Sequence, residues 1–158
     1  SFGQGVSVTP LQIFSAYMVI ANGGKLVKPH ILDTVISPSG EEKKIETTEV
    51  RQAIKPETAA KLKEMLVSVV ERGHGKKAAV EGFRVAGKTG TAQIPKKDGP
   101  GYEDTAHIGS FAGFAPADDP KFVMLVKLDR PTNVEWAESS AAPAFGAIAK
   151  WLLTNYYR

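Results

Sequence analysis

The chain has 158 residues, of which 42% are hydrophobic and 23% are charged, a balance that fits one ordinary globular domain with its own core and excludes a disordered tail or a repeat array. The formal net charge of +3 and the isoelectric point near 9.1 describe a mild basic excess that is spread over lysine pairs, so charge gives no support to nucleic-acid binding. Cysteine is absent, which excludes disulfides, thiol catalysis and cysteine-type zinc sites.

The first third of the chain predicts one helix and one strand pair. Residues 9–12, "TPLQ", have the form of a capping box with proline at the first helical position, and the apolar run that follows ends at Gly23-Gly24. We therefore expect a helix from about 10 to 22. Segments 30–37 ("HILDTVIS") and 43–50 ("KKIETTEV") flank a Pro-Ser-Gly turn, and this pattern predicts two paired strands.

A second helix is expected between Pro56 and Gly73, because proline favours the first turn of a helix and glycine its end. Leu62, Leu66 and Val69 lie at helical spacing along it. These three residues are therefore predicted to form its apolar face.

Three later segments predict a sheet: 83–94 ("FRVAGKTGTAQI"), 107–115 ("HIGSFAGFA") and 121–129 ("KFVMLVKLD"). The third is a nearly continuous apolar run, which is typical of a strand buried on both faces. The short turn "PADDP" at 116–120 predicts that the last two strands pair antiparallel. Residues 94–104 should form a longer polar loop between the first two strands.

A final helix should follow Pro143 and pack an apolar stripe on this sheet, formed by Phe145, Ile148, Ala149, Leu152 and Tyr156. The order helix, strand pair, helix, three strands, helix predicts an α+β fold, in which helices flank an antiparallel sheet with three strands from this chain. The remaining large aromatic side chains are more typical of a core than of a ligand platform: Phe111, Phe114, Phe122, Trp136 and Trp151.

Residues 85–92, "VAGKTGTA", hold the main candidate site. On a strand, Lys88 and Gly90 point to one face and Thr89 and Thr91 to the other, unless twist or an edge position brings several of them to a common rim. A lysine ammonium, threonine hydroxyls and a free strand-edge N–H together suit a bound carboxylate. A lysine on an exposed strand edge also protects against aggregation, so the tripeptide alone leaves both interpretations open.

The segments around this strand resemble a known family. "GQGVSVTPLQ", "IANGG", "RGHGKKAAVEGFRVAGKTGTAQ" and "HIGSFAGFAPADDP", with the final amphipathic helix, follow in order and spacing the second half of the transpeptidase domain of penicillin-binding proteins. "KTGTAQ" together with "SFAGFAP" is most similar to the monofunctional class B enzymes of septal or elongation cell-wall synthesis. The resemblance covers essentially the whole chain and implies the fold shared by these proteins and the serine β-lactamases.

The resemblance also implies a role for each residue of the strand. The family combines S-x-x-K, S-x-N and K-T-G motifs in one cleft. Lys88 would support the serine of the second motif, while Thr89 and Thr91 would hold the terminal carboxylate of a D-Ala-D-Ala stem peptide or of a β-lactam that mimics it. The main-chain N–H of Thr91 would be an oxyanion-hole donor, and Gly90 would let the substrate backbone come close.

The other two motifs are missing from the sequence as given, because no serine in it is followed by lysine at the third position or by asparagine at the second. Covalent catalysis needs a nucleophile held next to a base. We therefore expect residues 1–158 to be the C-terminal portion of a single transpeptidase domain that is inactive alone. The expected partner is the N-terminal part of that domain, whose anchor would place the protein on the extracytoplasmic face of the bacterial cell membrane.

Other chemistry-bearing residues give weaker signals. His30, His74 and His107 lie far apart without helical ligand spacing, so neither a metal site nor any cofactor is predicted. His107 is expected to be the first residue of the second strand and to lie near Lys88. Its role would be structural, or it would contact Lys88 without touching the ligand. His74 lies in "GHG", where many relatives of the family have threonine. The acidic residues of "GYEDTAH" fall in the predicted polar loop and are expected to be solvated.

Two classes of function remain open. In the first, the chain completes a D,D-transpeptidase that cross-links peptidoglycan by serine acyl transfer and is acylated by penicillin. In the second, it is a non-catalytic module that binds a peptide carboxylate or a cell-division or elongation protein. A sheet without its companion strands has an open edge and exposed apolar faces, which favours the first class because a second polypeptide would cover them.

Overall fold

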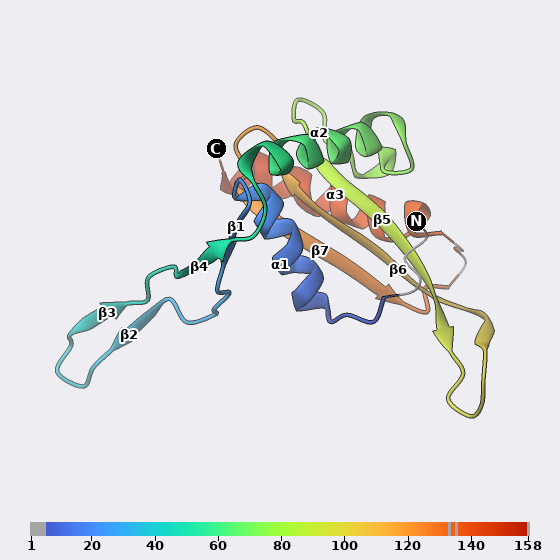
Figure 1. Cartoon of the computed structure of the whole chain (residues 1–158), viewed down its shortest axis with the longest axis horizontal. Helices are drawn as coiled ribbons and strands as arrows, with labels where there is room; N and C mark the ends of the chain where they lie inside the picture. The colour runs from blue at the N-terminus through green and yellow to red at the C-terminus, as the bar shows by residue number, and fades with distance from the viewer. Residues whose placement is uncertain (1–5, 133, 135, 158) are drawn as a thin grey trace.

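The computed structural model describes residues 6–132, 134 and 136–157, and helices lie on both sides of a central sheet (Figure 1). The elements are α1 (Pro10–Ala21), β1 (Lys25–Val27), β2 (Thr34–Ile36), β3 (Glu42–Lys44), β4 (Glu49–Gln52), α2 (Pro56–Arg72), η1 (Lys76–Ala78), β5 (Ala86–Pro95), β6 (Tyr102–Ala115), β7 (Phe122–Asp129), η2 (Ala137–Ser139), α3 (Ala141–Trp151) and η3 (Leu152–Tyr156). The predicted α+β class is confirmed. The start of the segment "GQGVSVTPLQ" lies outside the described residues.

The main sheet has the order β5-β6-β7, with both pairs antiparallel as predicted for the last two strands. The first two strands run further than the sequence pattern indicated, so the polar loop shrinks from 94–104 to residues 96–101. The prediction that the third strand is buried on both faces is wrong. The apolar side chains of β7 are half-buried, because among the described residues this strand has a sheet neighbour on one side only.

Two apolar clusters fill the two faces of the sheet. On one face Phe111 packs against Phe145 of α3, with ring centroids 4.6 Å apart. On the other face Phe114 packs with Val67 of α2, and Tyr17 of α1 lies against the same cluster. Neighbouring side chains on β6 point in opposite directions, so odd-numbered positions such as Phe111 face α3 and even-numbered positions face α1 and α2.

The ends of α1 follow the predicted signals. Thr9 Oγ1 accepts from the main-chain N–H of Gln12 at 3.2 Å, and Gln12 Oε1 accepts from the N–H of Thr9 at 2.8 Å, which completes the capping box. After the helix, Gly24 has a φ of +94°, and a Cβ there would lie 2.1 Å from the carbonyl oxygen of Ile54. Only glycine fits this turn, so the helix ends where the sequence predicted.

Helix α2 also has the predicted ends, but its buried face is rotated from the predicted stripe. The buried residues are Ala59, Val67 and Val70. The predicted residues, Leu62, Leu66 and Val69, are half-buried along the border of that face. The helix lies over the start of β5 (Figure 1), so it buries the side that meets the strand.

Helix α3 packs on the sheet as expected, but it begins at Ala141, so Pro143 sits inside the first turn instead of preceding it. Its apolar stripe is narrower than predicted. Phe145 and Ala149 are fully buried, whereas Ile148 and Tyr156 are 45% and 70% exposed. The helix continues into the wider π-type turns of η3, which shift the buried position to Leu153.

The segment between α1 and α2 forms an arm that projects from the body of the molecule (Figure 1). The single predicted strand pair is replaced by two short antiparallel ladders, β1 with β4 at the base and β2 with β3 at the tip. Most of the arm's side chains are exposed, including Ile31, Leu32 and Ile36. Across the described part of the chain, no helix has the length and apolarity needed to cross a bilayer.

Candidate functional site

Strand β5 carries the predicted site residues and lies at the edge of the described sheet, with β6 as its only neighbour there. Thr89 pairs with Phe111 and Thr91 with Gly109, so both threonines lie on the face covered by α3 and η2. Lys88 lies opposite Ala112, on the face toward α1 and α2. The alternation expected of a strand therefore separates the lysine from the threonines at the level of the backbone.

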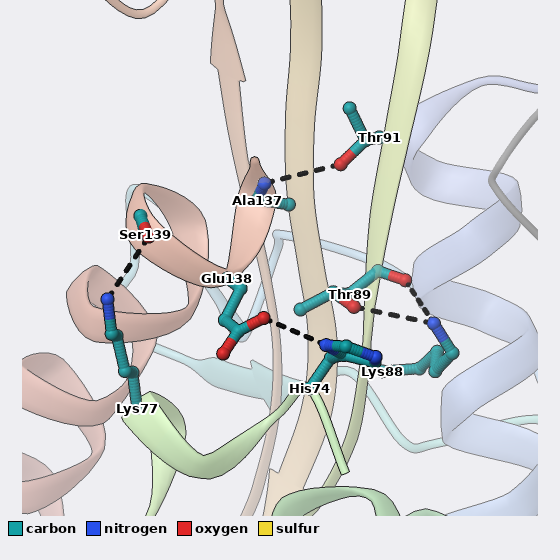
Figure 2. A network of polar contacts seen from close by, with 8 residues as sticks. All are labelled: His74, Lys77, Lys88, Thr89, Thr91, Ala137, Glu138 and Ser139. Carbon is teal, nitrogen blue, oxygen red and sulfur yellow. Dashed lines mark hydrogen bonds and ion pairs between the residues drawn. The ribbon is translucent and has the colours of Figure 1, made fainter. Parts of the chain in front are cut away.

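The lysine ammonium lies at the rim of the strand, on the side of α1, within reach of Thr89 (Figure 2). Lys88 Nζ donates to the carbonyl oxygen of Thr89 at 2.8 Å and lies 3.3 Å from Thr89 Oγ1. All four residues from Lys88 to Thr91 are half-buried. The structure thus brings a positive charge and a hydroxyl together at an accessible strand edge.

The hydroxyl of Thr91 is held by a different part of the chain. The main-chain N–H of Ala137, the first residue of η2, donates to Thr91 Oγ1 at 3.2 Å. A threonine hydroxyl that accepts one hydrogen still has its own hydrogen to donate. Thr89 Oγ1 is in the same situation because it accepts from Lys88. Among the described residues neither hydroxyl has an acceptor, so both hydrogens are available to an anion.

Gly90 and Gly109 make room for two close contacts on opposite faces. A Cβ on Gly90 would lie 2.8 Å from Ser110 Oγ, which donates to the Gly90 carbonyl at 3.2 Å. A Cβ on Gly109, the cross-strand partner of Thr91, would lie 2.7 Å from Ser140 Oγ. The glycine at 109 therefore allows η2 to approach the sheet at the level of Thr91.

His107 lies elsewhere than expected. Strand β6 already begins at Tyr102, and His107 pairs with Gln93, so it lies on the threonine face and not beside Lys88. The prediction that His107 is near Lys88 is wrong, because β5 and β6 run further and shift the point where the two strands meet. The Nε2 atom of His107 is buried without a hydrogen-bond partner among the described residues. The suggested role of His107 in supporting Lys88 stays a prediction.

The polar segment that follows β7 also reaches this site. Its polar composition gave no functional signal, yet η2 contacts Thr91 and is tied to the turn after α2 (Figure 2). His74 Nδ1 lies 2.9 Å from Glu138 Oε2, and Lys77 Nζ donates to Ser139 Oγ at 3.1 Å. These contacts join residues 62 and 64 positions apart, so no local pattern could have predicted them.

A comparison with known families identifies the family of this chain. Residues 1–150 match the family described as penicillin binding protein transpeptidase domain. The chain belongs to this family. Within it, the chain is 44% identical to the penicillin-binding protein PbpB of Mycolicibacterium smegmatis, over 98% of this chain and 25% of that protein. It is 37% identical to the probable peptidoglycan D,D-transpeptidase PenA of Neisseria flavescens, over 92% of this chain and 34% of that protein.

A solved structure of the same family shows the same fold. Penicillin-binding protein 3 of Mycobacterium tuberculosis, complexed with aztreonam, superposes with a TM-score of 0.87 at 34% identity, over 98% of this chain and 37% of that chain. The fold predicted from the resemblance to penicillin-binding proteins is confirmed. The chain spans a quarter to a third of the length of these two curated relatives, 25% and 34%.

Proposed function

We propose that this chain supplies the carboxylate-binding strand of a peptidoglycan D,D-transpeptidase, a serine enzyme that is acylated by β-lactams. The observation that carries the proposal is the pair of threonine hydroxyls on β5, each of which accepts an N–H and keeps its own hydrogen for a ligand. The ammonium of Lys88 adds a positive charge beside them. An anion with two acceptor oxygens, such as the terminal carboxylate of a D-Ala-D-Ala peptide or of a penicillin, suits this set of donors.

The edge position of β5 supports a second role for Thr91. Within a strand, successive residues direct their main-chain groups to alternate edges, so the N–H of Thr91 lies on the same edge as the carbonyl of Thr89. That carbonyl receives Lys88 Nζ at the rim. We assign the N–H of Thr91 as one donor of the oxyanion hole, where it would stabilise the charge that develops on the carbonyl oxygen during acylation.

The nucleophile of the proposed reaction belongs to the larger protein. The sequence as given has no serine in an S-x-x-K or S-x-N motif. We propose that residues 1–158 form the C-terminal portion of a single transpeptidase domain, and that the N-terminal portion is its main partner. We also propose that the protein acts at the extracytoplasmic face of the membrane, because peptidoglycan stem peptides lie in the cell wall. Contacts with cell-division or elongation proteins are part of the same proposal.

The direct test is the replacement of Lys88 by alanine in the complete protein. Loss of a hydrogen-bonding charge should lower the second-order rate constant of acylation by benzylpenicillin by about 10- to 150-fold. Lys43, an exposed lysine in the arm, provides the control, and Lys43→Ala should be acylated like the wild type. Normal acylation of Lys88→Ala would reject the proposed role of this residue.

The isolated chain separates the enzyme from a non-catalytic binding module. It should bind a D-Ala-D-Ala peptide without becoming acylated, which isothermal titration and intact-mass measurement after penicillin treatment would detect. Absence of binding heat at millimolar peptide would mean that the strand needs the rest of the domain. Binding by the isolated chain, with no penicillin labelling of the complete protein, would favour the module.

A further inference from the structure

The polar contacts around η2 link the surface of the molecule to Thr91 in three steps (Figure 2). The imidazole of His74 contacts the carboxylate of Glu138 at 2.9 Å, and Glu138 is the residue next to Ala137 in η2. The N–H of Ala137 in turn donates to Thr91 Oγ1. Beside this path, Lys77 Nζ of η1 donates to Ser139 Oγ, so η2 has two contacts with the segment between α2 and β5.

The position of η2 depends on these contacts. It has only three residues, and no side chain caps its N-terminus. Such a short 3₁₀ turn has little stability of its own, so its place is set by what it touches. Ala137 is 1% exposed against the sheet, which fixes the depth of η2. The exposed contacts of His74 and Lys77 hold its other side more weakly.

The geometry of the His74 contact identifies its donor. A carboxylate can only accept, so the hydrogen of this bond is on Nδ1 of His74. The side chain of His74 is 84% exposed and that of Glu138 is 38% exposed. A contact of this exposure is weak, so it can be removed without unfolding the chain.

We infer that His74 is a positioning residue for Thr91: through Glu138 and η2 it keeps the Thr91 hydroxyl oriented with its hydrogen free for a substrate carboxylate. The inference rests on the proposed function, because it concerns how the same threonine binds its ligand. It adds a residue outside β5, whose polar contact in the described part of the chain is with Glu138. The effect should be on ligand affinity, since the contact changes neither the nucleophile nor the leaving group.

The chain offers matched variants for the test. His74→Leu removes the donor and keeps a side chain of similar shape, whereas His74→Asn places an amide N–H near the position of Nδ1. Lys25→Met is the control, because Lys25 and Glu49 form an ion pair of the same length, 2.9 Å, in the arm, with exposures of 52% and 50%. Thr91→Val removes the hydroxyl through which His74 is inferred to act.

Stopped-flow acylation of the complete protein by benzylpenicillin separates the binding constant from the acylation rate constant. His74→Leu should weaken binding by about two- to five-fold, the range expected for an exposed ion pair, with the acylation rate constant unchanged. His74→Asn should restore wild-type binding and Lys25→Met should retain it. In the Thr91→Val background, His74→Leu should have no further effect.

Different results would overturn different statements. An unacylated wild-type protein would refute the proposed function. An acylated wild type in which His74→Leu binds penicillin normally, or loses the same factor with and without the Thr91 hydroxyl, would refute the inference alone. Amide hydrogen exchange of the chain tests the inference independently of acylation. His74→Leu should speed exchange at the Ala137 N–H, and Lys25→Met should not. Equal exchange at this N–H in the two variants would refute the inference.

Discussion

Replacement of Gly109 by alanine would test whether η2 needs a side-chain-free position on β6. A Cβ on Gly109 would lie 2.7 Å from Ser140 Oγ and 3.5 Å from Ala137 Cα. The distance of 2.7 Å is too short for a carbon and a hydroxyl oxygen that share no bond, so Ser140 or the whole of η2 must move. Ser140 is 9% exposed, which leaves it little free space.

The cost follows from the two possible responses. If Ser140 rotates, its hydrogen bond to the Trp136 carbonyl at 3.2 Å is lost, which costs about 1 kcal/mol. If η2 moves instead, the overpacking costs about 1–3 kcal/mol. Alanine is more favourable than glycine in a strand by about 0.5–1 kcal/mol, which offsets part of either cost. After this offset, Gly109→Ala is expected to lower the free energy of unfolding by about 0–0.5 kcal/mol if Ser140 rotates and by up to about 2.5 kcal/mol if η2 moves.

Equilibrium urea denaturation of the chain measures this loss, and Ser140→Ala provides the matched background. Without the Ser140 hydroxyl the close contact disappears, so Gly109→Ala should there be neutral or slightly stabilising. An equal loss in both backgrounds would show that Ser140 is not the obstacle and would refute the account of Gly109. The same variants should be compared for hydrogen exchange at Ala137, because a displaced η2 would release its N–H from Thr91.

Other expectations concern the core, the first helix and alkaline pH. Burial raises the pKa of Tyr17 to about 12. Because this folded-state pKa exceeds the unfolded value of about 10, the contribution of the protonated Tyr17 to the free energy of unfolding is complete below pH ~10. That contribution, up to about 3 kcal/mol, is lost as the pH rises through ~12. Tyr17→Phe should remove this part of the alkaline loss in urea midpoints, and an unchanged pH profile would contradict it. Phe145→Ala should destabilise by about 3–5 kcal/mol, since Phe145 is fully buried against Phe111, whereas Phe145→Leu should cost much less. Thr9→Ala should cost about 1 kcal/mol and Thr9→Ser almost nothing, because serine keeps the capping oxygen; equal losses would rule out the cap as the cause.

Features that depend on nearby residues could be predicted from the sequence. The capping box at Thr9 and the glycine that must follow α1 are set by contacts within a few positions, and their signals are strong. The three strands of the sheet were also predictable from β-branched and apolar content. The ends of the strands were harder to predict, because β5 and β6 extend past the polar residues that normally mark a loop. Mutual pairing across the hairpin supplies hydrogen bonds that composition alone does not indicate.

In the candidate site, too, the features set by nearby residues were predictable and the long-range contacts were not. Lys88, Thr89 and Thr91 share one strand, so their alternation was predictable, and the register agrees with it. The contact of Ala137 with Thr91 joins residues 46 positions apart, and it depends on a backbone N–H that every residue type except proline carries. No sequence pattern marks such a donor. The rotated face of α2 has a similar cause, since the buried side was decided by the strand beneath it.

The projecting arm has a consequence for how stability is distributed in the molecule. Its ladders are two-stranded and its side chains are largely exposed, so it opens at a small free-energy cost while the β5-β6-β7 sheet stays closed. Opening of the arm is therefore energetically separate from the site on β5. Changes of sequence or length between β2 and β3 are therefore expected to leave Thr91 in place, so this part of the chain can diverge while β5 stays fixed.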